Sequence, residues 1–248
     1  MLDIQRLSVK RASATVLEDL TLSLPKGSIT ALIGKNGSGK STLLSAIGGT
    51  CEASGEMLLD GFSIPSLSPR ERARHVSLLP QLLAAPHMTV RELVLLGRHP
   101  HRTAFSRLGG EDAIAVAGAI RDADISHLAD RYLDEISGGE LQRAYLGMIL
   151  SQDAPLWLLD EPTSHMDLSV AARFMGLLVK LTREKGNTIL VAIHDLNSAL
   201  RYADHIALLD DGHIAFFGTT EECLATDAIE RTFSVRRIGT SEEPFFIG

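Results

Sequence analysis

A glycine-rich run constrains the fold of this 248-residue chain more than any other feature. The run at residues 34–42 follows an apolar stretch at 29–33 and precedes a helical stretch at 42–47. Glycines let the backbone turn tightly, so that successive N–H groups converge on phosphate oxygens, and the helix N-terminus adds the positive end of its dipole. The sequence therefore predicts a strand, a phosphate-binding loop and a helix, in that order. The candidate nucleotide-binding residues of this Walker A pattern are Gly34, Asn36, Gly37, Ser38, Gly39, Lys40, Ser41 and Thr42.

Two side chains of the loop suit the chemistry of a nucleotide. Lys40 can reach the β- and γ-phosphates, and the Ser41 hydroxyl can bind Mg²⁺, which prefers oxygen ligands. The alternative is a glycine-rich turn without chemical meaning, against which the flanking strand and helix argue. Such loops occur in GTPases, kinases and motor ATPases, so the loop indicates the ligand class and leaves the activity open.

The rest of the chain alternates between strand and helix patterns. Continuous apolar runs at 29–33, 156–159, 188–193 and 206–209 are typical of strands covered on both faces, as in a parallel sheet. The residues from Val170 to Lys185 have a helical period, and Gly186 follows them as a helix stop. Strand patterns at 2–9, 16–24 and 56–64 predict an additional antiparallel layer. We therefore expect an α/β fold.

Three further regions complete the expected organisation. Residues 86–150 are rich in helix signals, including a capping box at Thr89–Glu92, and predict an inserted helical subdomain. Residues 1–85 and 151–235 are expected to form the catalytic core with its β subdomain. A strand and two short helices are expected from Ala215 onward, and residues 236–248 are expected to form a C-terminal tail.

Composition excludes several classes of protein. The chain has 31 acidic and 24 basic residues, giving a formal net charge of −7, which argues against broad nucleic-acid binding. Its two cysteines are too few for a disulfide framework, so the cytosol is the default compartment. No apolar run approaches the ~18 residues that a membrane-spanning helix needs. Any role at a membrane is therefore expected to depend on a partner.

Two carboxylates follow the apolar run at 156–159. Asp160 and Glu161 end a strand that we expect to be buried, where an unpaired charge would be costly without a cation or ligand. We expect Asp160 to hold the hydration shell of Mg²⁺ and Glu161 to polarise the attacking water. Without the glycine-rich loop, a surface position for the two acids would be an equally good explanation.

A second anion site is predicted upstream of these acids. The segment 136–143 reads Ile-Ser-Gly-Gly-Glu-Leu-Gln-Arg, in which Ser137 and Glu140 form a capping box, and Gly138 and Gly139 leave the helix start open to a phosphate. This segment resembles the signature motif of ABC ATPases. The resemblance covers nearly the whole chain, and it implies a P-loop (RecA-like), mostly parallel sheet core with an antiparallel β subdomain and an inserted α-helical subdomain. It also implies a head-to-tail homodimer that encloses two ATP molecules.

The resemblance assigns roles to three more residues. Gln81 matches the family's Q-loop glutamine, which contacts Mg²⁺ and the attacking water. Asp167 matches the D-loop aspartate, which works across the dimer interface. His194 matches the switch histidine, which contacts the γ-phosphate. With Lys40 and Glu161, the resemblance implies a catalytic set that uses ATP and Mg²⁺.

One position departs from the family. ABC ATPases usually place an aromatic residue about 23 residues before the Walker A loop to stack on adenine, but residues 1–61 contain no Phe, Trp or Tyr. Alignment by eye puts Arg11 there. A guanidinium plane can stack on a π face, so Arg11 is our hypothesis for the adenine platform, with a solvated surface arginine as the equal alternative.

Less specific sequence segments indicate the subfamily. Segments at 67–74, 96–102, 128–131 and 194–204 are similar to the ATPases of importers for iron siderophores, haem and cobalamin. This implies a subunit at the cytoplasmic face of the cell membrane that works with permease subunits and indirectly with a substrate-binding protein, without nucleic acid. The ATPase of an exporter, or a soluble ABC protein of translation or DNA repair, is the alternative. The segment Arg98–Arg102 is either part of the permease groove or a solvated charged loop.

Overall fold

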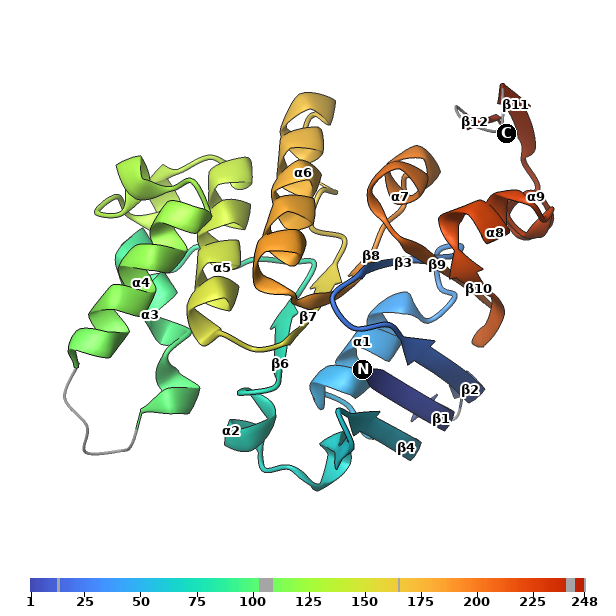
Figure 1. Ribbon diagram of the computed structural model, residues 1–248, viewed down its shortest axis with the longest axis horizontal. Helices are drawn as coiled ribbons and strands as arrows, with labels where there is room; N and C mark the ends of the chain where they lie inside the picture. Colours follow the sequence, from blue (N-terminus) through green and yellow to red (C-terminus); the bar gives the residue numbers. More distant parts are fainter. Residues whose placement is uncertain (13, 103–108, 165, 240–243, 248) are drawn as a thin grey trace.

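A six-stranded sheet forms the centre of the protein in a computed structural model that describes residues 1–12, 14–102, 109–164, 166–239 and 244–247 (Figure 1). Its strands are β3 (Ile29–Ile33), β6 (Val76–Leu79), β7 (Leu156–Asp160), β8 (Thr188–Ala192), β9 (His205–Asp210) and β10 (His213–Thr219). The order across the sheet is β10-β9-β3-β8-β7-β6, and all neighbours are parallel except β9 and β10. Every residue of β3, β7 and β8 is buried, as the continuous apolar runs predict.

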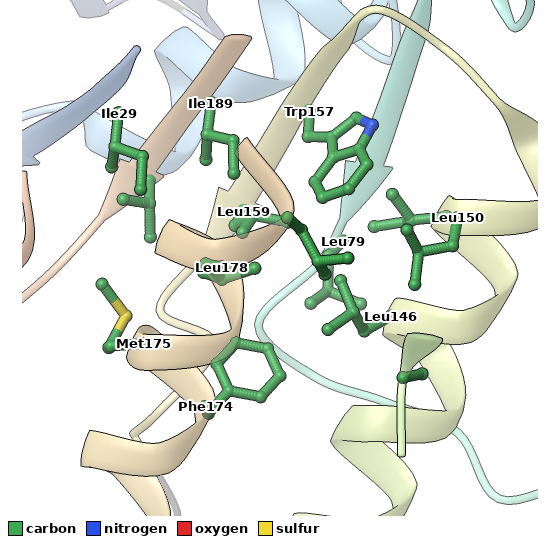
Figure 2. Packing of buried hydrophobic residues seen from close by; sticks show 14 of the residues in the cluster. Ile29, Leu79, Leu146, Leu150, Trp157, Leu159, Phe174, Met175, Leu178 and Ile189 are labelled. Atoms are coloured by element: carbon green, nitrogen blue, oxygen red, sulfur yellow. The ribbon is translucent and has the colours of Figure 1, made fainter. Parts of the chain in front are cut away.

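Helices cover the sheet on both faces. They are α1 (Lys40–Gly48), α6 (Leu168–Lys185), α7 (Leu196–Tyr202), α8 (Thr220–Leu224) and α9 (Ala228–Phe233). Successive side chains of a strand point to opposite faces. In β7, Trp157 and Leu159 join a buried cluster with residues of α6 (Figure 2). Leu156 and Leu158 join the cluster of α1 on the other face.

An antiparallel sheet packs against α1. It contains β1 (Leu2–Arg11), β2 (Ala14–Leu24), β4 (Ser54–Leu59) and the short β5 (Phe62–Ser63), in the order β2-β1-β4-β5. Asp60 and Gly61 connect β4 to β5 with φ angles of 47° and 86°, as a tight hairpin turn requires. The apolar face of this sheet shares its buried cluster with Leu43, Leu44 and Ile47 of α1. A short 3₁₀ turn (Ile64–Ser66) and α2 (Pro69–Arg72) lead from this sheet to β6.

Three helices form a group at one end of the molecule, away from the antiparallel sheet (Figure 1). They are α3 (Val90–Leu96), α4 (Gly110–Asp122) and α5 (Gly138–Gln152), with 3₁₀ turns at His99–His101, Ser126–Leu128 and Leu133–Glu135. Capping boxes begin α3 at Thr89 and α5 at Ser137. Leu146 and Leu150 of α5 lie in the cluster that contains Trp157 of the sheet, so this group packs on the core (Figure 2).

The C-terminal region differs from the expected tail. Strands β11 (Arg236–Gly239) and β12 (Pro244–Ile247) pair as an antiparallel hairpin. Phe246 packs against the main buried cluster, which gives the last residues an apolar anchor. The sequence analysis also did not predict β6, which lies at one edge of the six-stranded sheet, because a strand of four residues shows little periodicity. Within the described part of the chain, no helix is both long and apolar enough to span a membrane.

Candidate ATP-binding and hydrolysis site

The phosphate-binding loop connects β3 to α1, as the sequence predicts. Gly37 and Gly39 have φ angles of 82° and 107°, a region that side-chain-bearing residues avoid. A Cβ atom at Gly39 would lie 2.7 Å from Cδ2 of Leu17 and 3.3 Å from the carbonyl oxygen of Val16, so a side chain there would require β2 to give way. The loop is therefore shaped by backbone conformation and by close packing against a neighbouring strand.

Two polar side chains of the loop, Lys40 and Ser38, are buried and could bind phosphate oxygens. Lys40 is only 5% exposed, and its ammonium donates to the carbonyl oxygens of Gly34 (2.7 Å) and Lys35 (3.1 Å). Burial lowers the pKa of Lys40, and the negative charges of Glu161 and Asp160 partly oppose this shift. The Ser38 hydroxyl is buried without a hydrogen bond among the described atoms. Phosphate oxygens would satisfy both groups.

Asp160 lies at the end of β7 and faces the start of α1. The Ser41 hydroxyl donates to its Oδ1 atom over 3.1 Å. Burial raises the pKa of Asp160, with the Ser41 hydrogen bond opposing the shift and the Glu161 charge adding to it. A buried carboxylate beside a hydroxyl is a donor set that suits Mg²⁺. The residues present therefore fit the metal that the sequence predicts.

Glu161 occupies the centre of the site. Its Oε2 atom accepts a hydrogen bond from Nε2 of Gln81 over 2.7 Å, and its Oε1 atom contacts Nε2 of His194. Glu161 has a φ angle of 49°, which costs a residue with a side chain about 1–2 kcal/mol, and its N–H donates to Ala192 of β8. The three side chains follow β6, β7 and β8, which are neighbours in the sheet. Their convergence is therefore a consequence of strand order.

A cavity of about 540 Å³ joins these groups. It is lined by Arg11, Val16, Asn36, Gly37, Gly39, Lys40, Ser41, Thr42, Gln81, Glu161 and His194. The position of Arg11 at this cavity agrees with the adenine-platform hypothesis but does not test stacking. Val16 is a lining residue that the sequence analysis did not single out, because nothing distinguishes it from other apolar residues of a strand.

The signature segment lies at a different cavity, of about 350 Å³. This cavity is lined by Ser137, Gly138, Gly139, Glu140, Arg143, Met166, Asp167 and Val170, none of which lines the first cavity. Ser137 caps α5: its hydroxyl accepts the N–H of Glu140, and the Glu140 carboxylate accepts the N–H of Ser137 over 2.8 Å. Asp167 caps α6 in the same way by accepting the N–H of Val170. One chain thus brings Asp167 and the signature together, away from the loop.

The segment Arg98–Arg102 is not simply a solvated loop. The Arg98 side chain is 13% exposed, forms an ion pair with Asp112 (3.1 Å) and donates to the carbonyl of Ser151 (2.7 Å). His101 contacts the carbonyl of Gln152 over 2.8 Å, so both residues serve the C-terminal end of α5. The solvated alternative is wrong for Arg98, because its side chain is largely buried and paired with a carboxylate that is equally buried.

Comparison with known proteins identifies the family. A family model described as ABC transporter matches residues 17–164. The chain belongs to the ABC transporter family. It is 42% identical over 234 residues to the ferric enterobactin transport ATP-binding protein FepC of Escherichia coli K12, covering 94% of this chain and 86% of FepC. It is 37% identical over 236 residues to the iron(3+)-hydroxamate import ATP-binding protein FhuC of Bacillus subtilis 168, covering 94% and 88%.

Solved ABC structures have the same fold. The dimeric structure of MJ0796, a bacterial ABC transporter cassette, matches with a TM-score of 0.78 and 26% identity, over 89% of this chain and 99% of MJ0796. The ADP-bound cassette MJ1267 matches with a TM-score of 0.83 and 24% identity, over 94% and 98%. The expected fold class is therefore confirmed, and as an ABC ATPase the chain binds and hydrolyses ATP.

Proposed function

We propose that this ABC ATPase powers the import of an iron chelate of the siderophore class, haem or cobalamin through a membrane permease. The observation that carries the proposal is its similarity, over nearly the whole chain, to ATPases named for ferric enterobactin and iron(3+)-hydroxamate transport. The petrobactin import ATP-binding protein YclP of Bacillus subtilis is related over a similar length, with 35% identity. The first two relatives are named for different chelates of ferric iron.

The chain's own groups can hold ATP in a defined orientation. The N–H groups of residues 36–42 face the phosphates, and Lys40 exchanges its carbonyl partners for the β- and γ-phosphates. Arg11 lies at the same cavity and is our candidate for the base platform. Ser41, Asp160 and Gln81 would hold Mg²⁺, which would supply positive charge to the phosphate oxygens during phosphoryl transfer.

Glu161 is the group best suited to take a proton from the attacking water. Glu161 is 8% exposed, and both its carboxylate oxygens already face groups that can order them, Gln81 and His194. Gln81 holds the carboxylate in place, and His194, which lines the same cavity, is our candidate for contact with the γ-phosphate. Because phosphoryl transfer depends mainly on positioning and charge stabilisation, this arrangement supplies what hydrolysis needs.

Hydrolysis requires a second copy of the chain in this proposal. The loop cavity and the signature cavity have no lining residue in common, so one nucleotide bound at the loop leaves the signature unused. In a head-to-tail homodimer, Ser137, Gly138 and Gly139 of the partner subunit complete each ATP site, with Asp167 at the interface. An open helix start offers N–H groups and a positive dipole end to the γ-phosphate.

The partners follow from the same role. The dimer docks on permease subunits at the cytoplasmic face of the cell membrane, and a substrate-binding protein delivers the chelate from the other side. The transported compound never contacts this chain. The acidic net charge of −7 agrees with a protein that does not bind nucleic acid.

The variant Glu161→Gln tests the catalytic part. It keeps the size of the side chain and one acceptor oxygen but removes the base, so we expect hydrolysis to fall by about 10³-fold while ATP binding persists. Size-exclusion chromatography with light scattering should then detect an ATP-dependent dimer. Wild-type hydrolysis in this variant, or a monomer at saturating MgATP both with and without the permease, would contradict the proposal.

Uptake measurements test the transport part. A strain that lacks this chain should lose the uptake of one class among ⁵⁵Fe-labelled catecholate siderophore, ⁵⁵Fe-labelled hydroxamate siderophore, haem and labelled cobalamin. The wild-type gene should restore uptake, and the Glu161→Gln gene should not. Unchanged uptake of all four classes would point to an exporter, and purification with ribosomes or DNA in place of a permease would point to a soluble ABC protein.

A further inference from the structure

The segment that follows Gln81 is tied to helix α5. The Tyr145 hydroxyl donates a hydrogen bond to the carbonyl of Ala84 over 2.8 Å. Tyr145 lies about two helical turns after Ser137, the residue that caps α5 at the signature cavity. Burial raises the pKa of Tyr145, so its phenol remains a hydrogen-bond donor at neutral pH. One side chain thus links the loop beside Glu161 to the helix that carries the signature.

The same segment has two more ties to the residues just before α5. The His87 ring stacks on Tyr132 with a centroid separation of 4.2 Å and an interplanar angle of 5°, and its Nδ1 atom lies 3.2 Å from Oδ2 of Asp134. The N–H of Leu133 donates to the carbonyl of Met88 over 2.9 Å. Among the described hydrogen bonds that residues 82–88 make outside their own segment, every partner lies between residues 133 and 145. By its described hydrogen bonds, the loop is therefore attached to the helical group.

The other side of Gln81 also rests on α5. Leu79 ends β6, which is in contact with α5, and Leu79 and Leu146 belong to one buried cluster (Figure 2). Leu146 is adjacent to Tyr145 in the helix. Gln81 thus lies between two fixed positions, the packed Leu79 before it and the hydrogen-bonded carbonyl of Ala84 after it. The α5 residues that contact these two positions are neighbours on one turn of the helix.

We propose that Tyr145 is a positioning residue for Gln81. Its hydroxyl fixes the loop so that the Gln81 amide stays on Glu161, and it couples that amide to the position of Ser137 at the start of α5. The inference rests on the proposed role of Glu161 in hydrolysis. Tyr145 itself touches neither nucleotide cavity among the described lining residues.

Steady-state ATP hydrolysis by the full chain tests this role. Tyr145→Phe removes one hydroxyl and keeps the ring, so we expect kcat to fall about three- to tenfold through the loss of one hydrogen bond. KM for ATP should stay within about twofold, because the residues that line the cavity are unchanged. The matched control is Tyr202→Phe at the end of α7, where the half-buried ring has no described hydroxyl hydrogen bond, and its kcat should equal that of the wild type.

A double-mutant cycle separates positioning from general stability. If Tyr145 acts through Gln81, adding Tyr145→Phe to Gln81→Ala should cause no further loss of kcat. Hydrogen exchange of residues 82–88 should also be faster in Tyr145→Phe, while exchange in α6 stays the same. An equal loss in both backgrounds, unchanged exchange of the loop, or an unchanged kcat would overturn the positioning role. A wild-type chain without ATP hydrolysis would instead overturn the proposed function, and the exchange measurement would still report on the anchor.

Discussion

The two cavities of this ATPase differ in how completely one chain builds them. The loop cavity gathers side chains from the ends of β3, β6, β7 and β8, where Lys40, Asp160 and Glu161 are each at least 92% buried. The signature cavity has exposed caps: the described hydrogen bonds of Ser137 and Asp167 stay within the first turns of α5 and α6. A covered parallel sheet can organise the first cavity alone, since its strand ends meet at one edge. The second cavity offers only the ends of two helices, which is what a site shared between two subunits requires.

The largest effect on ATP hydrolysis is expected at the loop cavity, whose charged residues are buried. Lys40→Ala removes the ammonium that we expect to bind the β- and γ-phosphates, so ATP hydrolysis should fall by about 10³-fold and ATP binding should weaken strongly. Phosphate release and binding of a fluorescent ATP analogue measure the two effects. Lys26→Ala, at an exposed lysine that pairs with Asp60, is the control and should keep both properties. Full ATP binding by the Lys40 variant would show that the loop does not hold the phosphates.

A substitution in the signature cavity should lower ATP hydrolysis without weakening ATP binding to a single chain. Ser137→Ala should lower kcat by about 10²-fold, because the contact to the nucleotide of the partner subunit is lost. A Ser137→Ala monomer should still bind ATP normally, because its loop cavity is unchanged. Thr219→Ala is a matched control, because Thr219 caps α8 with the same capping-box geometry but lies at neither cavity. Both variants should lose about 1 kcal/mol of unfolding free energy, measured with urea. Equal losses of hydrolysis in both variants would reduce the signature to an ordinary helix cap.

Mixing the two defective proteins tests the shared site directly. In a head-to-tail dimer of one Lys40→Ala subunit and one Ser137→Ala subunit, one nucleotide site carries both defects and the other carries neither. An equal mixture should therefore recover about a quarter of the wild-type rate, since half of the dimers are mixed and each has one intact site. The rate of the mixture is compared with the mean of the two separate variants. A rate equal to that mean would exclude composite sites.

Local pattern in the sequence predicts the phosphate-binding loop, whereas only the family resemblance groups the remaining residues of the loop cavity. The strand, loop and helix around Lys40 follow from spacing alone. The convergence of Gln81, Glu161 and His194 depends on the strand order β6-β7-β8, which no local pattern specifies, so only the family resemblance brings these residues together. The charges at Arg98 suggest a solvated loop because the partner, Asp112, comes from a separate helix. The hairpin of β11 and β12 is too short to leave a clear periodic signal.

The smallest expected effect concerns the base end of the loop cavity. Arg11 and Val16 line that cavity, and no aromatic residue precedes the loop in the sequence, so a guanidinium must provide any stacking surface from this part of the chain. Arg11→Ala should raise KM for ATP about two- to fivefold, because a cation–π contact at an exposed site contributes about 0.5–1 kcal/mol. Its kcat should remain unchanged, since the base lies away from Glu161. Arg11→Tyr should restore or lower KM, because an aromatic ring stacks on a base at least as well as a guanidinium does. If Arg11→Ala leaves KM unchanged, the residue is a surface arginine. ATP binding at the loop cavity would then depend on the residues that bind the phosphates and not on a stacking surface for the base.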